Sequence, residues 1–173
     1  HEREGEATLE SFRDGWRHVR FMLLNAPNYL FLLPGVIFGA LGVALLLSAV
    51  FQTSAGGFTL GGNAAIAGSF LFVVGYQATN MGIFATIASD PIQRPNDVVT
   101  ETVIERMSLE RISTIGIVLF TVGALYSTVV IFRWVNSGFV LLPGVAWNVI
   151  GLTAMAVGIQ TMFNAFFMPA VDD

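Results

Sequence analysis

Four arginines near the N-terminus are the residues of this sequence best suited to chemistry. Arg13, Arg17 and Arg20 are separated by four and three residues, and Arg3 lies upstream of them. Such spacing places side chains on one side of an α-helix. Because a guanidinium group binds phosphate oxygens through two parallel hydrogen bonds, this stripe is a candidate site for a lipid-linked phosphate. Basic residues beside apolar segments also anchor proteins to membranes, and composition alone favours that simpler interpretation.

An amphipathic helix must position these arginines. Ser11 and Asp14 have the spacing of a helix N-terminal capping box. A proline at position 27 disfavours helical backbone in the residue before it, so we predict a helix from Phe12 to about Leu24. A second, apolar stripe lies beside the arginines: Phe12, Trp16, Val19 and Leu23. A helix with these two stripes is expected to lie in the headgroup layer of a bilayer.

The rest of the chain has the composition of a membrane protein. Only 12% of its residues are charged, against roughly 25% in soluble domains, and its mean hydropathy is +0.71. No Asp, Glu, Lys, Arg or His occurs in residues 29–89, 112–132 or 134–171. Because a helical span needs roughly 20 apolar residues, we predict four transmembrane helices. The predicted fold is an all-α membrane protein: two hairpins of transmembrane helices preceded by an amphipathic juxtamembrane helix. The arm covers residues 1–27 and the membrane domain 28–169, with spans at about 28–51, 62–88, 112–135 and 142–167.

The arginines also predict the orientation of these spans. The N-terminal arm and the middle loop hold seven of the eight basic residues, and only Arg133 lies on the other side. By the positive-inside rule, both termini and the middle loop are cytoplasmic in a multi-pass protein of the cell membrane. Within that loop, residues 97–110 are predicted to be either a short interfacial helix or a solvated connector.

Glycine recurs every seven residues in all four predicted spans. The positions are Gly35 and Gly42, then Gly61, Gly68, Gly75 and Gly82, then Gly116 and Gly123, then Gly144, Gly151 and Gly158. Small residues on one face let helices approach closely in lipid, so the pattern predicts a tightly packed bundle. Offsets between these glycines suggest two similar hairpins arranged in parallel. A competing match, Leu-Leu-Pro-Gly-Val at 32–36 and 141–145, relates the first span to the fourth instead.

Among the polar side chains of the predicted spans, we single out four amides. Gln77 and Asn80 belong to the second span, and Gln160 and Asn164 to the fourth. They are candidates for contact with a lipid phosphate or sugar. Asn and Gln within spans more often hydrogen-bond between helices, and we favour that interpretation here.

The chain itself is not expected to contain a complete active site. It has no cysteine and only two histidines, His1 and His18. No catalytic triad, paired carboxylates or set of metal ligands can be recognised, and we predict no metal site, cofactor or catalytic residue within it. A chain that begins with His1 is expected to be a piece of a longer protein. The expected partners are the lipid bilayer and a further domain; a homo-oligomer is compatible with the sequence, and nothing indicates nucleic acid.

The N-terminal arm resembles the junction of membrane-anchored family 2 glycosyltransferases, the dolichyl-phosphate (polyprenyl-phosphate) hexose synthases. The stretch Phe12-Arg-Asp-Gly-Trp-Arg-His-Val-Arg-Phe-Met-Leu23 is similar to theirs at nearly every position. Residues 66–69, 75–77 and 109–111 resemble their membrane domain. A Ser-Lys pair of the family is Ala7-Thr8 here, so Arg3 or Arg13 would have to replace that lysine.

This resemblance implies an activity for the parent protein. It would transfer a hexose from a nucleotide sugar to polyprenyl (dolichyl) phosphate at the cytoplasmic face. A GT-A catalytic domain upstream of His1 would hold the catalytic residues and a divalent metal, Mg or Mn. This chain would anchor that domain and present the polyprenyl phosphate to it, with the arginines near the phosphate. The arginine-only, acidic composition suggests a halophilic archaeal source. The alternative is a non-enzymatic four-span scaffold or flippase-like protein of the GtrA type.

Overall fold

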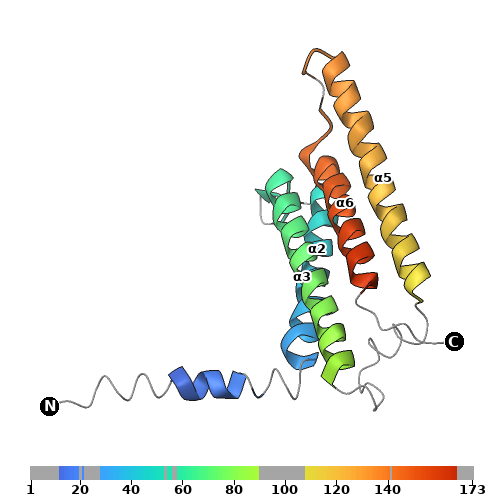
Figure 1. Cartoon of the computed structure of the whole chain (residues 1–173). Coiled ribbons are helices and arrows are strands. Elements are labelled where there is room, and N and C mark those ends of the chain that lie inside the picture. The colour runs from blue at the N-terminus through green and yellow to red at the C-terminus, as the bar shows by residue number, and fades with distance from the viewer. Residues whose placement is uncertain are drawn as a thin grey trace.

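The computed structural model describes residues 12–19, 21, 28–52, 54–55, 58–89, 108–140 and 142–166. Four long helices make up most of this part of the chain (Figure 1). They are α2 (Leu33–Val50), α3 (Gly62–Ser89), α5 (Leu109–Asn136) and α6 (Val145–Ala165). A π-helical segment, η1 (Asn28–Leu32), leads into α2, and residues 12–19 and 21 are also helical. The prediction of an all-α architecture is therefore confirmed for the described residues, apart from one very short hairpin.

That hairpin lies between α2 and α3, in the glycine-rich segment that separates the first two predicted spans, residues 52–61. Strand β1 (Ser54–Ala55) pairs antiparallel with β2 (Phe58–Thr59), with Ser54 opposite Thr59. Gln52, just before β1, has a positive φ of 49°. The two strands shorten the connection, so α3 returns directly along α2.

Local backbone chemistry sets the ends of α5. The Ser108 side chain accepts a hydrogen bond from the backbone N–H of Arg111 at 3.4 Å, which caps the start of the helix. The helix therefore begins at Leu109, three residues before the predicted span. At the other end, Gly138 and Phe139 both have a φ of 69° and turn the chain back toward α6. The Phe139 ring packs edge-on against Trp134, with ring centroids 4.9 Å apart.

The helices pair as two antiparallel hairpins, α2 with α3 and α5 with α6. Figure 1 shows α6 between α3 and α5, so the hairpins meet along α3 and α6. These two helices run parallel, because each is the second helix of its hairpin. The loop between α5 and α6 extends beyond the β1–β2 end of the first hairpin (Figure 1).

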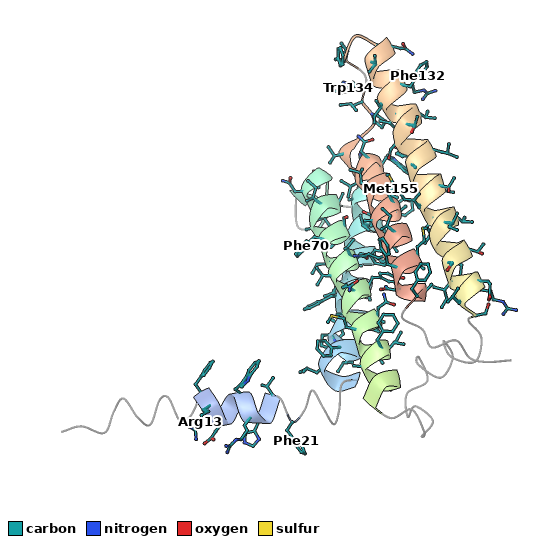
Figure 2. The ribbon with its side chains drawn as sticks, viewed as in Figure 1. Arg13, Phe21, Phe70, Phe132, Trp134 and Met155 are labelled. Carbon is teal, nitrogen blue, oxygen red and sulfur yellow. The ribbon has the colours of Figure 1, made fainter. Side chains whose placement is uncertain are left out.

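Most large apolar side chains of the helices point outward. Phe70 on α3 and Phe132 on α5 are 67% and 68% exposed, and Figure 2 shows both directed away from the bundle. The buried residues of α2 are instead small: Gly35, Gly42 and Ala49. A body with small residues inside and large apolar residues outside is suited to a hydrocarbon solvent.

Three helical segments are long and apolar enough to cross a membrane: Leu30–Val50, Leu109–Asn136 and Val145–Ala165. The sequence predicts four spans, so the count by length and composition is one lower within the described residues. The difference concerns α3, which has 28 residues and no charged side chain but carries several polar ones. Among them are Ser69, Tyr76, Gln77, Thr79 and Asn80.

Candidate functional site

Glycine pairs hold each hairpin together at backbone distance. A Cβ atom added to Gly42 would lie 2.7 Å from the Gly68 carbonyl oxygen, and one added to Gly75 would lie 2.6 Å from that of Gly35. The second hairpin repeats this arrangement with Gly116 opposite Gly158 and Gly123 opposite Gly151. Any larger side chain at these places would force the backbones apart.

The seven-residue glycine pattern therefore marks helix contacts, although not throughout. Gly61 and Gly144 lie at helix starts, and an added Cβ would meet nothing within 4 Å at either one. The predicted tight bundle consists of two closely packed hairpins, since the glycine pairs lie inside each hairpin. The equivalent pairs Gly35–Gly75 and Gly116–Gly158 support the parallel repeat over the competing match of the first span to the fourth.

A different chemistry joins the two hairpins along a contact that we call the α3–α6 seam. The Ser69 hydroxyl lies 2.6 Å from that of Thr153, and the Tyr76 hydroxyl lies 2.6 Å from that of Thr161. Both threonines donate their own proton to a carbonyl of α6, Thr153 to Val149 and Thr161 to Val157. Ser69 and Tyr76 must therefore be the donors across the seam, because each threonine hydroxyl has only one proton.

The seam has an apolar end and a polar end. Near the start of α6, Ala49, Ala65 and Ala146 form a buried cluster in which helices from both hairpins touch. Polar side chains follow along both helices from Ser69 and Thr153 toward the far ends of α3 and α6. The seam is thus closed by alanines at the β1–β2 end and becomes increasingly polar toward the end where α2 begins.

The four amides predicted from the sequence do not form one site. Gln77 is exposed on α3, whereas Asn80 donates from Nδ2 to the carbonyl of Tyr76 at 2.9 Å. On α6, Gln160 and Asn164 are partly buried, and two of their atoms, Gln160 Oε1 and Asn164 Nδ2, are buried without a hydrogen-bond partner. The interhelical hydrogen bonds that we favoured for these amides are made by Ser69 and Tyr76. Ser69 and Tyr76 share the seven-residue step of the glycines, but hydroxyl-bearing residues were not among those singled out from the sequence.

The N-terminal helix carries the described part of the arginine stripe. Arg13 and Arg17 are exposed, as are the apolar Phe12 (77%) and Trp16 (60%). Helical geometry puts Phe12, Trp16 and Val19 on one side and Arg13 and Arg17 on the flank beside it. Figure 2 shows this helix apart from the four-helix body. Arg3 and Arg20 lie outside the described residues, as do residues 97–107 of the middle loop.

A metal site cannot be built from the described residues. They contain no group of three or more His, Cys, Asp or Glu side chains that could hold an ion. This part of the chain also contains no cysteine. The described residues can form hydrogen bonds through hydroxyls and amides and ion pairs through charged side chains, Arg13 and Arg17 among them.

These features describe a membrane-embedded helical domain with a basic, amphipathic entry helix. A profile described as the glycosyltransferase family 2 C-terminal transmembrane region matches residues 83–172. The chain belongs to this family, as the resemblance of its arm predicted.

A curated relative covers the whole chain. It is the "Low-salt glycan biosynthesis hexosyltransferase Agl6" of Haloferax volcanii, which is 43% identical over 173 residues. The match covers all of this chain but only 42% of the relative, so the chain corresponds to its C-terminal part. No solved structure matches the chain.

Proposed function

We propose that this chain anchors a hexosyltransferase in the membrane and presents polyprenyl (dolichyl) phosphate to its catalytic domain at the cytoplasmic face. The observation that carries the proposal is the helix of residues 12–19. Arg13 and Arg17 are exposed there beside the apolar Trp16, on a segment that leads into α2. An interfacial helix of this kind holds guanidinium groups at the depth of lipid phosphates.

The remaining parts of the reaction belong to the rest of the protein. A GT-A domain upstream would bind the nucleotide sugar, and its acidic residues would hold Mg or Mn. The relative's name as a hexosyltransferase favours this reading over a non-enzymatic scaffold or flippase.

In this proposal α3 also crosses the membrane, which brings the number of spans to four, and both termini are cytoplasmic. It packs along α2 through glycine pairs and along α6 through hydroxyls. Four of its polar side chains have hydrogen-bond partners inside the protein: Ser69, Tyr76, Thr79 and Asn80. Polar groups that are satisfied in this way are tolerated in a bilayer. Seven of the eight arginines then lie on the cytoplasmic side.

Lipid binding by arginine variants tests the phosphate role. In the full-length protein, Arg13, Arg17 and Arg20 would be changed together to Gln, and binding of polyprenyl phosphate would be measured in detergent micelles. We expect a loss of affinity of at least tenfold, because each bidentate guanidinium–phosphate pair contributes about 1.5–3 kcal/mol. Replacement by Lys should keep part of the affinity, since the charge remains but the paired geometry is lost.

Arg133→Gln is the matched control, because this exposed arginine lies at the opposite end of the body, near the end of α5. It should bind polyprenyl phosphate like the unchanged protein. Unchanged affinity in the triple Gln variant would leave the arginines with an anchoring role only.

A further inference from the structure

Two buried amide atoms at the polar end of the α3–α6 seam have no partner. They are Oε1 of Gln160, an acceptor, and Nδ2 of Asn164, a donor, and each exposes less than 1 Å². Leaving a buried polar atom unsatisfied costs about 1–3 kcal/mol. In a bilayer no solvent on the hydrocarbon side can provide the missing bond. Two such atoms one helical turn apart point to a bound group that neither helix supplies.

The two amides lie on the same side of α6 as the hydroxyls that bridge the hairpins. Gln160 follows Thr153 by seven residues and precedes Asn164 by four, spacings that return to one helical face. On the parallel helix α3, Asn80 lies one turn beyond Tyr76, as Asn164 lies about one turn beyond Thr161. Asn80 Nδ2 uses one of its two N–H groups on the Tyr76 carbonyl, and Gln160 Oε1 accepts no hydrogen bond from it or from any other group of the protein.

The chemistry of the two atoms defines what can bind. One hydroxyl group can donate its proton to Gln160 Oε1 and accept a hydrogen bond from Asn164 Nδ2, which satisfies both. A carboxylate or a fully deprotonated phosphate fits poorly, because it has no proton to donate to Oε1. No charged residue lies in residues 62–89 or 145–165 to compensate an anion held between α3 and α6. A buried, uncompensated charge would be far more costly than a neutral hydroxyl.

We propose that Gln160 and Asn164 form a binding site for one neutral hydroxyl group at the polar end of the α3–α6 seam. The hydroxyl comes from a polyol headgroup of a membrane lipid or from water. Asn164 lies next to Ala165, the last residue of α6, so the site is close to the membrane surface on the side where α2 begins. The proposal does not depend on the arginines and stands or falls separately from the phosphate role.

Two lipids of equal charge, one with headgroup hydroxyls and one without, distinguish these sources. Phosphatidylglycerol and phosphatidylmethanol have the same single negative charge and can carry the same acyl chains, but only the first has free hydroxyls. The full-length protein would be reconstituted in nanodiscs of each lipid and its thermal unfolding recorded. A melting temperature that is a few degrees higher in phosphatidylglycerol indicates a lipid hydroxyl, provided that Gln160→Met and Asn164→Leu each abolish the difference.

Water as the bound group gives a different pattern. Melting would then be equal in the two lipids, but each single variant would lower it, and the double variant would lower it by no more than one single variant does. Such non-additivity is expected when two side chains share one bridging group. Gln77→Met is the matched control, because Gln77 is an exposed glutamine of α3, and it should leave melting unchanged in both lipids.

The proposal is overturned if the near-isosteric variants Gln160→Met and Asn164→Leu each raise the melting temperature in both lipids. That result would mean that the two amides are unpartnered in the folded protein and that removing them relieves a cost. Additive losses with no difference between the lipids would also overturn it, since the two side chains would then act independently.

Discussion

Glycines, which have no side chain beyond a hydrogen atom, decide how closely these helices pack. At Gly42 an added Cβ would lie 2.7 Å from the Gly68 carbonyl oxygen and 2.7 Å from Phe72 Cα. Both atoms belong to the backbone of α3 and cannot rotate away. Gly39, on the same helix, has nothing within 4 Å of an added Cβ. Two glycines three residues apart therefore have opposite tolerances for one methyl group.

We expect Gly42→Ala to destabilise the domain and Gly39→Ala to leave it as stable or slightly more so. Overpacking a tight contact costs about 1–3 kcal/mol. At Gly39 alanine adds no clash and gains up to about 1 kcal/mol in helix propensity. Thermal unfolding of both variants in one detergent, beside the unchanged protein, measures the difference. Equal melting of the two variants would show that α2 and α3 are not in backbone contact at Gly42.

At the scale of elements, helices within one hairpin and helices of different hairpins are held together by different interactions. Within a hairpin, backbones meet at glycines, so separating the helices loses dense packing over most of their length. Between hairpins, the seam relies on two hydroxyl bridges and an alanine cluster. Hydrogen bonds between membrane helices average only about 0.6 kcal/mol. The seam is therefore the weaker joint, and its polar end is the weaker part of it.

Cysteine cross-linking tests the seam directly. Ser69 and Thr153 have side-chain oxygens 2.6 Å apart, so Ser69→Cys with Thr153→Cys should form a disulfide on mild oxidation. The described residues contain no cysteine that would compete. Any cysteine elsewhere in the full-length protein would first be replaced. Mass spectrometry of the intact protein, before and after reduction, measures the yield.

The neighbouring pair Phe70→Cys with Leu152→Cys is the control. Both side chains are exposed, at 67% and 60%, so they point away from the seam, and little cross-linking is expected. A higher yield for this pair than for the first would mean that α3 and α6 meet through other faces.

At the scale of the whole molecule, sequence periodicity predicted the repeated glycine contacts within each hairpin and missed the individual contacts between the hairpins. A seven-residue step marks one helix face, which is why Gly35, Gly42, Gly116 and Gly158 were found as packing residues. Gly144 fits the same period yet lies at a helix start, where no helix faces it. Periodicity cannot tell a helix face from a cap.

Contacts between the hairpins depend on a register that sequence alone does not set. Gln77 and Gln160 have equivalent positions in the repeat, but Gln77 is exposed and Gln160 has a buried atom, because only one of them faces the seam. The hydroxyl bridge from Tyr76 to Thr161 joins residues 85 positions apart. No local pattern relates such residues, so a structure was needed to pair them.

We expect α3 to cross the membrane. If α3 crosses, residues before and after it lie on opposite sides of the bilayer. Single cysteines at the exposed positions Thr59, Ser108 and Asn136 report this in intact cells treated with a membrane-impermeant maleimide. We expect Thr59→Cys and Asn136→Cys to be labelled from outside, and Ser108→Cys only after the membrane is permeabilised. The permeabilised sample also shows that each cysteine can react.

Labelling of Thr59→Cys and Ser108→Cys from the same side would mean that α3 does not cross, and the domain would have three spans. The N-terminal arginines would then lie on the opposite side of the membrane from the C-terminus, because an odd number of crossings separates the ends of a chain. The uncharged helix α3 packs against α2 through glycines, and four of its polar side chains (Ser69, Tyr76, Thr79 and Asn80) have hydrogen-bond partners within the protein. That is the physical reason to expect four spans.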